Sequence, residues 1–355
     1  MRMLLTLLAL GLVLAAPAGA VSGGKKASPA DVPFIVALPN GCTGTLIAPD
    51  RVLTAGHCLD NFAPTNFRVH IGPLHNPGWT GGGVATRGFS VEPRFKESFP
   101  FAHRSPQNAI AQYDVGIILL EQPVTGVTPV KLGTSADDKV GTHGSLFGYG
   151  LHTSNPRDFS TLLRTGDLSV IAASKCERAY PKAIIASELC TQDLKSKRAP
   201  LVQACPGDSG GPTLISTPDG PVEIGITSWG PEVKDAKCGV KPLPEVAMRV
   251  SSFLSFINDP SPVIEPFPTG DSPYATVSGV AKVGGTLTCN VPPLGGSPAK
   301  LSYRWFFHNK LVSRAKTATA TKDMVGHSVG CLATARNAGG HIEMFTPKVG
   351  RLIVR

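Results

Sequence analysis

A serine flanked by glycines is the feature of this sequence that most directly suggests covalent chemistry. Residues 207–212 read Gly-Asp-Ser-Gly-Gly-Pro, directly after Cys205 and Pro206. A serine hydroxyl attacks a carbonyl only when a base accepts its proton and amide donors face the oxyanion that forms. Because glycine permits tight turns, backbone N–H groups here can point at the same spot as the Ser209 hydroxyl. The pattern predicts a nucleophile, although taken alone it also suits an ordinary surface loop.

Two further residues complete a set suited to nucleophilic catalysis. His57 stands in Leu-Thr-Ala-Gly-His-Cys at 53–58, and Asp114 opens an apolar run that ends at Leu120. A histidine can accept the serine proton, and an aspartate can hold the imidazole in the required tautomer and stabilise its charged form. The chain order is His, Asp, Ser, which differs from the orders in subtilisins and α/β-hydrolases.

In these motifs and their order, the sequence resembles the trypsin/chymotrypsin family of serine proteases over residues 21–258, roughly two thirds of the chain. The resemblance implies a secreted serine endopeptidase that hydrolyses peptide bonds through an acyl-enzyme. It assigns the catalytic triad to His57, Asp114 and Ser209, and the oxyanion hole to the backbone N–H groups of Gly207 and Ser209. The alternative is an inactive homologue that acts as an adhesin or binding protein. Inactive relatives usually lose a triad residue, and none is lost here.

The same resemblance assigns a substrate-binding set: Gln203, Ser228, Trp229, Gly230 and Glu245. Ser228 matches a serine that steadies the aspartate, and Trp229 and Gly230 match residues that line the groove for an extended substrate. Gln203 stands six residues before the nucleophile, at the base of the pocket for the side chain preceding the scissile bond (P1). An aspartate there would select Lys or Arg, so this anchor is absent.

Glu245 offers a second way to select a cation. Aligning Pro244 with the family's Pro-Gly-Val pattern puts Glu245 where a glycine normally leaves the pocket open. A partly buried carboxylate without a partner is costly, and a substrate cation would relieve that cost. We therefore expect P1 Lys or Arg, with some tolerance for large apolar residues. If Pro242 is the aligned proline, Glu245 faces solvent and the pocket prefers Phe, Tyr or Leu.

The N-terminus predicts a secretory signal peptide over residues 1–20. Arg2 supplies positive charge, residues 3–16 form an apolar run, and Ala-Gly-Ala at 18–20 is a small-residue cleavage site. A membrane anchor is the competing interpretation, but the run falls short of the roughly 20 residues that span a bilayer. We expect a secreted, extracellular protein.

An activating N-terminus follows this cleavage site directly. In the family, a new N-terminal ammonium pairs with the aspartate before the serine, which here is Asp208. Residues 21–24 read Val-Ser-Gly-Gly, and no basic residue except Arg2 precedes Val21. Signal cleavage itself would therefore expose the activating terminus, without a zymogen stage.

Export places the eight cysteines in an oxidising compartment, where they can form disulfides. Eight cysteines allow 105 connectivities, so spacing alone does not choose among them. The family resemblance implies three pairs, Cys42–Cys58, Cys176–Cys190 and Cys205–Cys238, and leaves Cys289 with Cys331. A zinc site is the weaker alternative, because no Cys-x-x-Cys or His-Glu-x-x-His motif occurs.

Composition narrows the class of protein. Charged residues make up 17% and hydrophobic residues 42%, which excludes a disordered chain and a membrane bundle. The formal charge is +9, but the one dense basic run, at 195–198, has no aromatic neighbours. We therefore expect no nucleic-acid partner. We also expect no membrane span, no cofactor and no metal, and the ligands of this protein to be protein or peptide substrates.

Short apolar runs separated by Gly, Pro, Asn and Asp predict an all-β protein. Examples are residues 34–38, 44–47, 115–120 and 223–228. The family resemblance makes these the strands of two antiparallel six-stranded β-barrels over residues 21–258. The active site would lie between the barrels, and a short helix would end the unit at 249–258.

A proline-rich linker at 259–273 marks the clearest domain boundary, because proline stiffens a spacer that buries little apolar surface. Residues 274–355 hold Cys289, Trp305 and Cys331. A tryptophan between two cysteines fills the core of small β-sandwiches beside their disulfide. This region resembles a bacterial immunoglobulin-like module of unknown partner, and another small disulfide-bonded β-domain is the alternative. Few apolar residues cross the linker, which predicts independent folding.

Overall fold

The computed structural model describes residues 20–28, 30–59, 67–72, 83–98, 110–150, 162–230, 238–258, 266–269, 272–297, 299–307, 310–337, 340–347 and 352–355. The predicted signal peptide lies outside these residues, except for Ala20. Within these ranges, no helix combines the length and the apolar character needed to cross a membrane.

The strands between residues 35 and 120 form a closed β-barrel in the order β2-β3-β4-β9-β6-β5. Its strands are β2 (Ile35–Ala37), β3 (Thr43–Ala48), β4 (Arg51–Thr54), β5 (Arg68–Ile71), β6 (Val84–Val91) and β9 (Gly116–Leu120). All five residues of β9 are buried. Gly116 opens this strand where a Cβ atom would lie 2.6 Å from Leu59 Cδ1, so a side chain there would force Leu59 to move.

A second barrel follows in the order β12-β11-β14-β15-β16-β13, and pairing of β12 with β13 closes it. Its strands are β11 (His143–Gly148), β12 (Arg164–Val170), β13 (Glu188–Gln192), β14 (Pro212–Thr217), β15 (Gly220–Trp229) and β16 (Glu245–Arg249). The expectation of two six-stranded antiparallel barrels is therefore confirmed. Outside this barrel, β1 (Lys25–Lys26) extends it beside β12, and β10 (Lys131–Leu132) pairs with β15 in parallel.

Helices are few and short in the described part of the chain. They are η1 (Gly56–Leu59), α1 (Ala173–Ala179), η5 (Val250–Ser252), α2 (Leu254–Ile257) and η6 (Lys322–Met324). The helix expected at 249–258 is divided into η5 and α2. The backbone leaves helical values at Phe253 (φ −122°), whose ring is buried in the same core as Ile257. The short helix α1 carries Cys176 and was not predicted.

A strand-rich C-terminal lobe, defined here as the described residues from 266 to 355, has a hydrophobic core of its own. One sheet contains β18 (Thr276–Gly279), β19 (Thr286–Asn290) and β23 (Thr317–Thr319); the other contains β22 (Lys310–Ser313), β21 (Lys300–Phe307), β24 (Ser328–Asn337), β25 (Gly340–Phe345) and β26 (Leu352–Ile353). Trp305 is fully buried, and Cys289 and Cys331 are bonded in the same core.

The boundary of this lobe lies earlier than the sequence suggested. The linker was expected to run to residue 273, but Phe267 and Pro268 already form strand β17, which pairs with β20 (Leu294–Gly295). Phe267 is 8% exposed, and the stretch that holds it was expected to be a spacer. Burial of this ring and the pairing with β20 tie Phe267 and Pro268 to the lobe.

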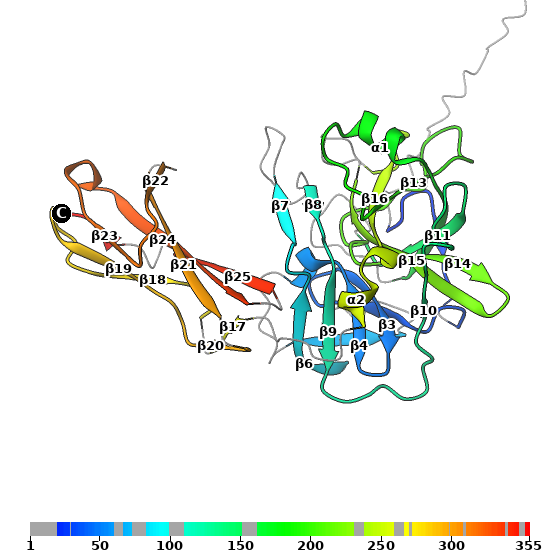
Figure 1. Cartoon of the computed structure of the whole chain (residues 1–355), viewed down its shortest axis with the longest axis horizontal. Coiled ribbons are helices and arrows are strands. Elements are labelled where there is room, and N and C mark those ends of the chain that lie inside the picture. The colour runs from blue at the N-terminus through cyan, green and yellow to red at the C-terminus, as the bar shows by residue number, and fades with distance from the viewer. Residues whose placement is uncertain are drawn as a thin grey trace, which may run out of the picture.

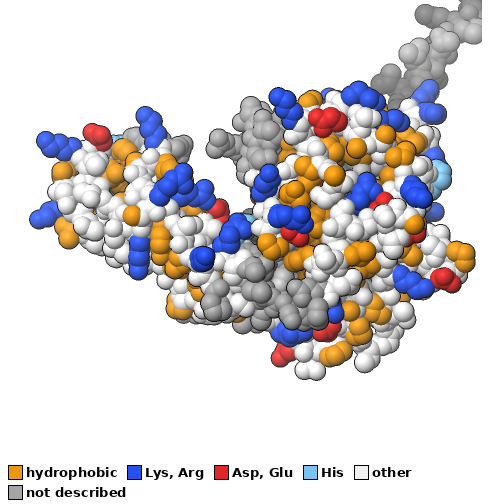
Figure 2. Space-filling model, viewed as in Figure 1, with side chains coloured by type: hydrophobic (Ala, Val, Ile, Leu, Met, Phe, Trp, Pro, Cys, Tyr) orange, Lys and Arg blue, Asp and Glu red, His pale blue; other side chains and the backbone are white. Residues whose placement is uncertain are grey.

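The lobe stands beside the first barrel and reaches it through β25, which lies next to β6 (Figure 1). A hairpin of β7 (Lys96–Ser98) and β8 (Ile110–Gln112) rises from the barrel on the same side. Figure 2 shows a hollow between the lobe and the two barrels, and basic side chains spread over both parts on this face.

Four disulfides form in the described part of the chain: Cys42–Cys58, Cys176–Cys190, Cys205–Cys238 and Cys289–Cys331. These are the pairs that the sequence analysis expected. The first closes the loop that carries His57, and the third joins the loop of Ser209 to the segment after Trp229. Both therefore restrain chain segments that carry candidate site residues.

Candidate active site

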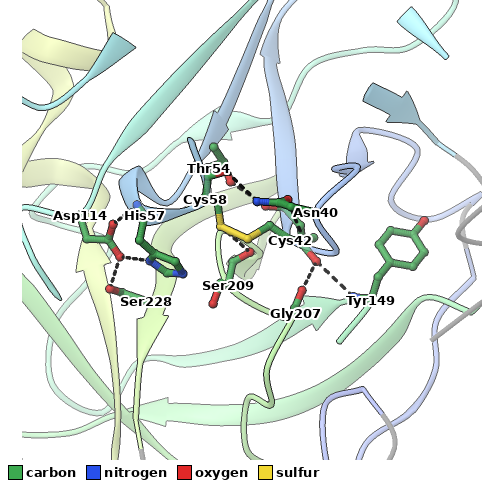
Figure 3. The surroundings of a disulfide bond; sticks show 11 residues. Asn40, Cys42, Thr54, His57, Cys58, Asp114, Tyr149, Gly207, Ser209 and Ser228 are labelled. Carbon is green, nitrogen blue, oxygen red and sulfur yellow. Dashed lines mark hydrogen bonds and ion pairs between the residues drawn. A yellow bond between two sulfur atoms is a disulfide. The ribbon is translucent and has the colours of Figure 1, made fainter. Parts of the chain in front are cut away.

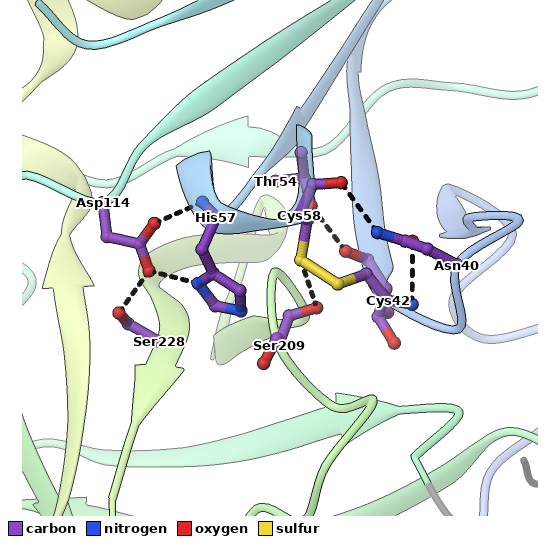
Figure 4. Close-up of polar contacts among 9 residues, drawn as sticks. Asn40, Cys42, Thr54, His57, Cys58, Asp114, Ser209 and Ser228 are labelled. Carbon is purple, nitrogen blue, oxygen red and sulfur yellow. Dashed lines mark hydrogen bonds and ion pairs between the residues drawn. A yellow bond between two sulfur atoms is a disulfide. The ribbon is translucent and has the colours of Figure 1, made fainter. Parts of the chain in front are cut away.

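The residues expected to form the triad meet where the two barrels join. His57 lies in η1, directly after β4, and Asp114 lies just before β9 of the same barrel. Ser209 comes from the second barrel, in the loop that leads into β14. Figure 4 shows the imidazole of His57 between the carboxylate of Asp114 and the side chain of Ser209. The three residues are far apart in sequence and are brought together by the packing of the barrels.

Asp114 fixes His57 through two hydrogen bonds. The backbone N–H of His57 donates to Oδ1 at 2.7 Å, and Nδ1 of the ring lies 2.7 Å from Oδ2. The hydroxyl of Ser228, on β15, also donates to Oδ2. Because Nδ1 is held by the carboxylate, Nε2 is the ring nitrogen turned towards the serine (Figure 4).

Asp114 is fully buried, and its pKa reflects a balance of opposing effects. Burial alone would raise the pKa, because desolvation disfavours the charged form. The nearby His57 and the hydrogen bonds from His57 and Ser228 outweigh burial, so the pKa lies below its usual value. The carboxylate therefore stays ionised beside the imidazole at neutral pH.

Positive φ angles at two glycines shape the loop around Ser209. Gly207 has φ of 94° and Gly210 has φ of 79°. A Cβ atom at Gly210 would also lie 2.1 Å from Thr54 Oγ1, so the two barrels approach closely there. Among the described residues, neither the Gly207 nor the Ser209 N–H donates to another backbone group. Both are thus available to an oxyanion.

Thr43 holds this loop from the first barrel and was not singled out in the sequence. Its N–H donates to the Ser209 carbonyl at 2.8 Å, and its hydroxyl donates to the Gly207 carbonyl at 3.1 Å. The same hydroxyl accepts the N–H of Tyr149 at 3.1 Å (Figure 3). Its position directly after Cys42, which is bonded to Cys58, was the available signal.

Asp208 is buried below the serine and accepts three backbone N–H groups. The donors to its two oxygens are Cys205 at 2.7 Å, Val21 at 2.9 Å and Gly150 at 2.9 Å. Burial raises the pKa of Asp208 to about 6, and these hydrogen bonds oppose that shift. Val21 is thus already seated at the carboxylate with which an N-terminal ammonium would pair.

Glu245, the residue expected to anchor P1, is buried. It is 4% exposed, and the backbone N–H of Ala204, two residues before Pro206, donates to Oε1. Its pairing with Thr191 across β13 and β16 sets this inward orientation, so the alternative in which Glu245 faces solvent is not observed. A Cβ atom at Gly230 would lie 3.8 Å from Glu245 Cγ, so these two residues border the same space.

Burial raises the pKa of Glu245 to about 8, and the nearby carboxylates of Asp208 and Asp193 add to the rise. The only opposing contribution is the Ala204 hydrogen bond. The Gln203 side chain makes no hydrogen bond to Glu245, because its polar atoms bind other groups. Its Nε2 donates to the carbonyls of Lys241 and Leu243, and its Oε1 accepts the Gly239 N–H. Gln203 thus fixes the 239–243 segment.

Trp229 forms a wall with two residues that sequence analysis did not identify. The ring of Tyr180 packs edge-on against the indole at 5.1 Å. Glu188 is 2% exposed, and the Ile185 N–H donates to its Oε2 at 2.8 Å. Burial raises the pKa of Glu188 to about 8, and the hydrogen bond from the Ile185 N–H opposes that rise. No short-range sequence pattern joins these residues.

The sulfur atoms of Cys42 and Cys58 lie close to His57, but they are joined in a disulfide. They therefore offer no thiolates, and we assign no metal-binding role to this group.

Comparisons with known proteins agree with this geometry. The trypsin family model matches residues 21–257. The chain is 31% identical over 258 residues to "Lectizyme" from Glossina austeni, which covers 68% of this chain and 87% of the relative. It is 28% identical over 244 residues to "Trypsin" from Saccharopolyspora erythraea, and this alignment covers 67% of this chain and 96% of the relative. Among solved structures, "Neuropsin, a serine protease expressed in the limbic system of mouse brain" aligns with a TM-score of 0.50 and 26% identity, covering 66% of this chain and 96% of that one.

Proposed function

Because this chain belongs to the trypsin family and is a serine endopeptidase, we propose that Ser209, His57 and Asp114 are its catalytic triad. The observation that carries the proposal is the double hydrogen bond from His57 to a buried, ionised Asp114. It fixes the ring orientation that a general base needs.

The geometry supports a two-step hydrolysis of the peptide bond. Nε2 of His57 takes the proton of Ser209 as its oxygen attacks the carbonyl, and the N–H groups of Gly207 and Ser209 stabilise the oxyanion. His57 then protonates the leaving amine, which leaves an acyl-enzyme. A water molecule, deprotonated by the same histidine, releases the acid and restores the serine. Asp114 stays ionised and stabilises the imidazolium in both steps.

For the P1 residue we propose Lys or Arg, with Glu245 as the anchor. Its buried carboxyl has one hydrogen bond and no cationic partner among the described residues. A substrate ammonium or guanidinium would supply that partner and favour the ionised form. Large apolar P1 residues remain acceptable because the neutral carboxyl carries no charge.

We further propose that the protein is secreted and that cleavage after Ala20 activates it. The four disulfides suit an oxidising compartment. Cleavage would convert the Val21 N–H, already 2.9 Å from Asp208, into an ammonium. N-terminal sequencing of the active protein should then give Val-Ser-Gly-Gly, and a start at Ala27 would contradict the proposal.

An organophosphonate probe tests the proposed nucleophile directly. The purified protein should be labelled on the peptide that contains Ser209, and Ser209→Ala should abolish labelling while the protein stays folded. Thr217→Ala is a matched control, because this hydroxyl lies on β14 and is bonded to the Gly220 carbonyl. Labelling that survives in Ser209→Ala, or none in the wild type, would contradict the proposed function.

A further inference from the structure

The segment from Glu92 to Glu97 lies between the C-terminal lobe and the catalytic residues. It joins β6 to the β7–β8 hairpin of the first barrel. The Glu92 N–H donates to the Val115 carbonyl at 2.9 Å, next to Asp114. The Arg94 guanidinium stacks over the ring of Tyr113, the residue before Asp114, at 4.6 Å from the ring centre. This segment therefore packs against the chain on both sides of the catalytic aspartate.

Phe95 extends the same packing to His57. Its ring is 4% exposed, and a Cβ atom at Gly56 would lie 3.4 Å from Phe95 Cδ2 and 3.1 Å from Asp114 Oδ1. The ring is thus in contact with the turn that carries the catalytic histidine. Any displacement of Phe95 would be felt at that turn, because packed interiors transmit changes in shape.

The C-terminal lobe holds this segment through two residues. Arg336, at the end of β24, donates from Nη1 to the Pro93 carbonyl at 3.3 Å. The ring of His341, on β25, lies 6.2 Å from the ring of Phe95 at a tilt of 32°. That separation is within the range of favourable aromatic contacts. Burial and the adjacent Arg336 lower the pKa of His341, so its ring is neutral when it meets Phe95.

The hairpin that follows this segment lies beside β15, whose last residue, Trp229, is assigned to the substrate groove. Strand β8 contacts β15, the strand that ends in Trp229. The Gln112 side chain of β8 donates to the Ala183 carbonyl at 3.1 Å, close to Tyr180 of the tryptophan wall. The side chain of Glu97 on β7 is exposed overall, but partial burial of its carboxyl group raises its pKa. His57 lowers this pKa, whereas the carboxylates of Asp114 and of Glu343 in the lobe raise it. The hairpin therefore stands between the lobe and the groove.

We infer that Arg336 and His341 are positioning residues through which the C-terminal lobe holds the 92–97 segment and the β7–β8 hairpin in place for binding of extended substrates. The inference rests on the proposed function, since it assigns a role at that same groove. Substrate residues before P1 would run between the hairpin and Trp229. A P1-only substrate does not reach the hairpin and does not depend on the lobe in this way.

The test compares two substrates with the same P1 residue, a tetrapeptide amide and a single-residue amide, on full-length protein. Arg336→Ala and His341→Ala should each raise KM for the tetrapeptide by about threefold to tenfold, the size of one net hydrogen bond. The kcat value and the single-residue substrate should be unchanged. His341→Phe, which keeps an aromatic ring, should restore the wild-type KM. Lys282→Ala, in an exposed turn of the same lobe, serves as the control.

The outcomes separate the two proposals. An active wild type whose Arg336→Ala and His341→Ala variants treat both substrates as the wild type does would overturn the lobe's role alone. Equal losses on both substrates, or a His341→Phe variant as impaired as His341→Ala, would also overturn it. A wild type that hydrolyses neither substrate contradicts the proposed function, and the inference with it.

Discussion

Asp114 and Glu245 are both buried carboxyl groups, yet their pKa values shift in opposite directions. Asp114 is fully buried and Glu245 is 4% exposed. Asp114 accepts hydrogen bonds from the His57 backbone, the His57 ring and Ser228, whereas Glu245 accepts one from Ala204. The pKa of Asp114 is lowered and that of Glu245 is raised to about 8. Partners, more than burial, therefore decide the charge of each group.

The difference corresponds to two different tasks. The site of Asp114 is complete before substrate arrives, because its cationic partner, His57, belongs to the protein. The site of Glu245 lacks a cation among the described residues, and the proposed P1 side chain would supply it. Preorganisation suits a group that must stabilise a transient imidazolium, and an unfilled site suits a group that selects a substrate.

The largest expected effect comes from replacing a residue of the proposed triad. Replacing His57 or Ser209 by Ala should lower kcat by about 10⁶, because triad residues act as a unit. Asp114→Asn should lower it by about 10⁴, because the amide favours the wrong imidazole tautomer. Steady-state kinetics on a peptide substrate measures both. A Ser209→Ala enzyme that kept most of its activity would exclude the triad.

A smaller effect is expected at the unfilled site. Glu245→Gln keeps the shape and the Ala204 hydrogen bond but removes the charge that a P1 cation would meet. The ratio of kcat/KM for matched Lys and Phe substrates should fall by about 10²-fold, the usual size for losing one partner of a buried charge pair. Asp167→Asn is a control, because it removes an exposed carboxylate on β12 that is not among the groups shifting the pKa of Glu245. A Lys preference that survives in Glu245→Gln would place the charge elsewhere.

A third effect concerns stability instead of catalysis and involves Glu188, which resembles Glu245 in lacking a cation. Its pKa rises from 4.5 to about 8 on folding. The folded state therefore favours the protonated form, so the stability linked to this group is fully present below pH 4.5 and is lost as pH rises through about 8. The expected slope is about 1.4 kcal/mol per pH unit within that window. Urea unfolding of Glu188→Gln should show a shallower decline of stability between pH 5 and 8, and an unchanged decline would contradict the assignment.

The apolar runs predicted the strands locally, whereas the family resemblance implied the two barrels and the triad that we propose. The motifs around His57, Asp114 and Ser209 each lie within a few residues, and the strands follow short apolar runs. The choice between Pro244 and Pro242 could not be made locally, since the pairing of Glu245 with Thr191 decides it across two strands. That pairing depends on closure of the barrel.

The buried acidic residues and the contacts between distant segments could not be predicted from the sequence patterns. Glu188 and Glu223 were not identified as buried, because a glutamate in a strand is usually solvated. Glu223 is fully buried, and burial raises its pKa well above the usual value, although the nearby Thr45 hydroxyl opposes that rise. The contact of Arg336 with Pro93 joins residues 243 positions apart. The immunoglobulin-like identity of the C-terminal lobe stays a prediction.

The pH dependence of substrate preference tests most directly whether partners set the charge of these two buried acids. We expect the ratio of kcat/KM for a Lys substrate over its Phe counterpart to rise between pH 6 and 9, as Glu245 ionises near pH 8. The ionisation of His57 and Asp114 affects both substrates and cancels in the ratio. Glu245→Gln should give a ratio that does not change with pH. A flat ratio in the wild type, or the same rise in Glu245→Gln, would contradict the account.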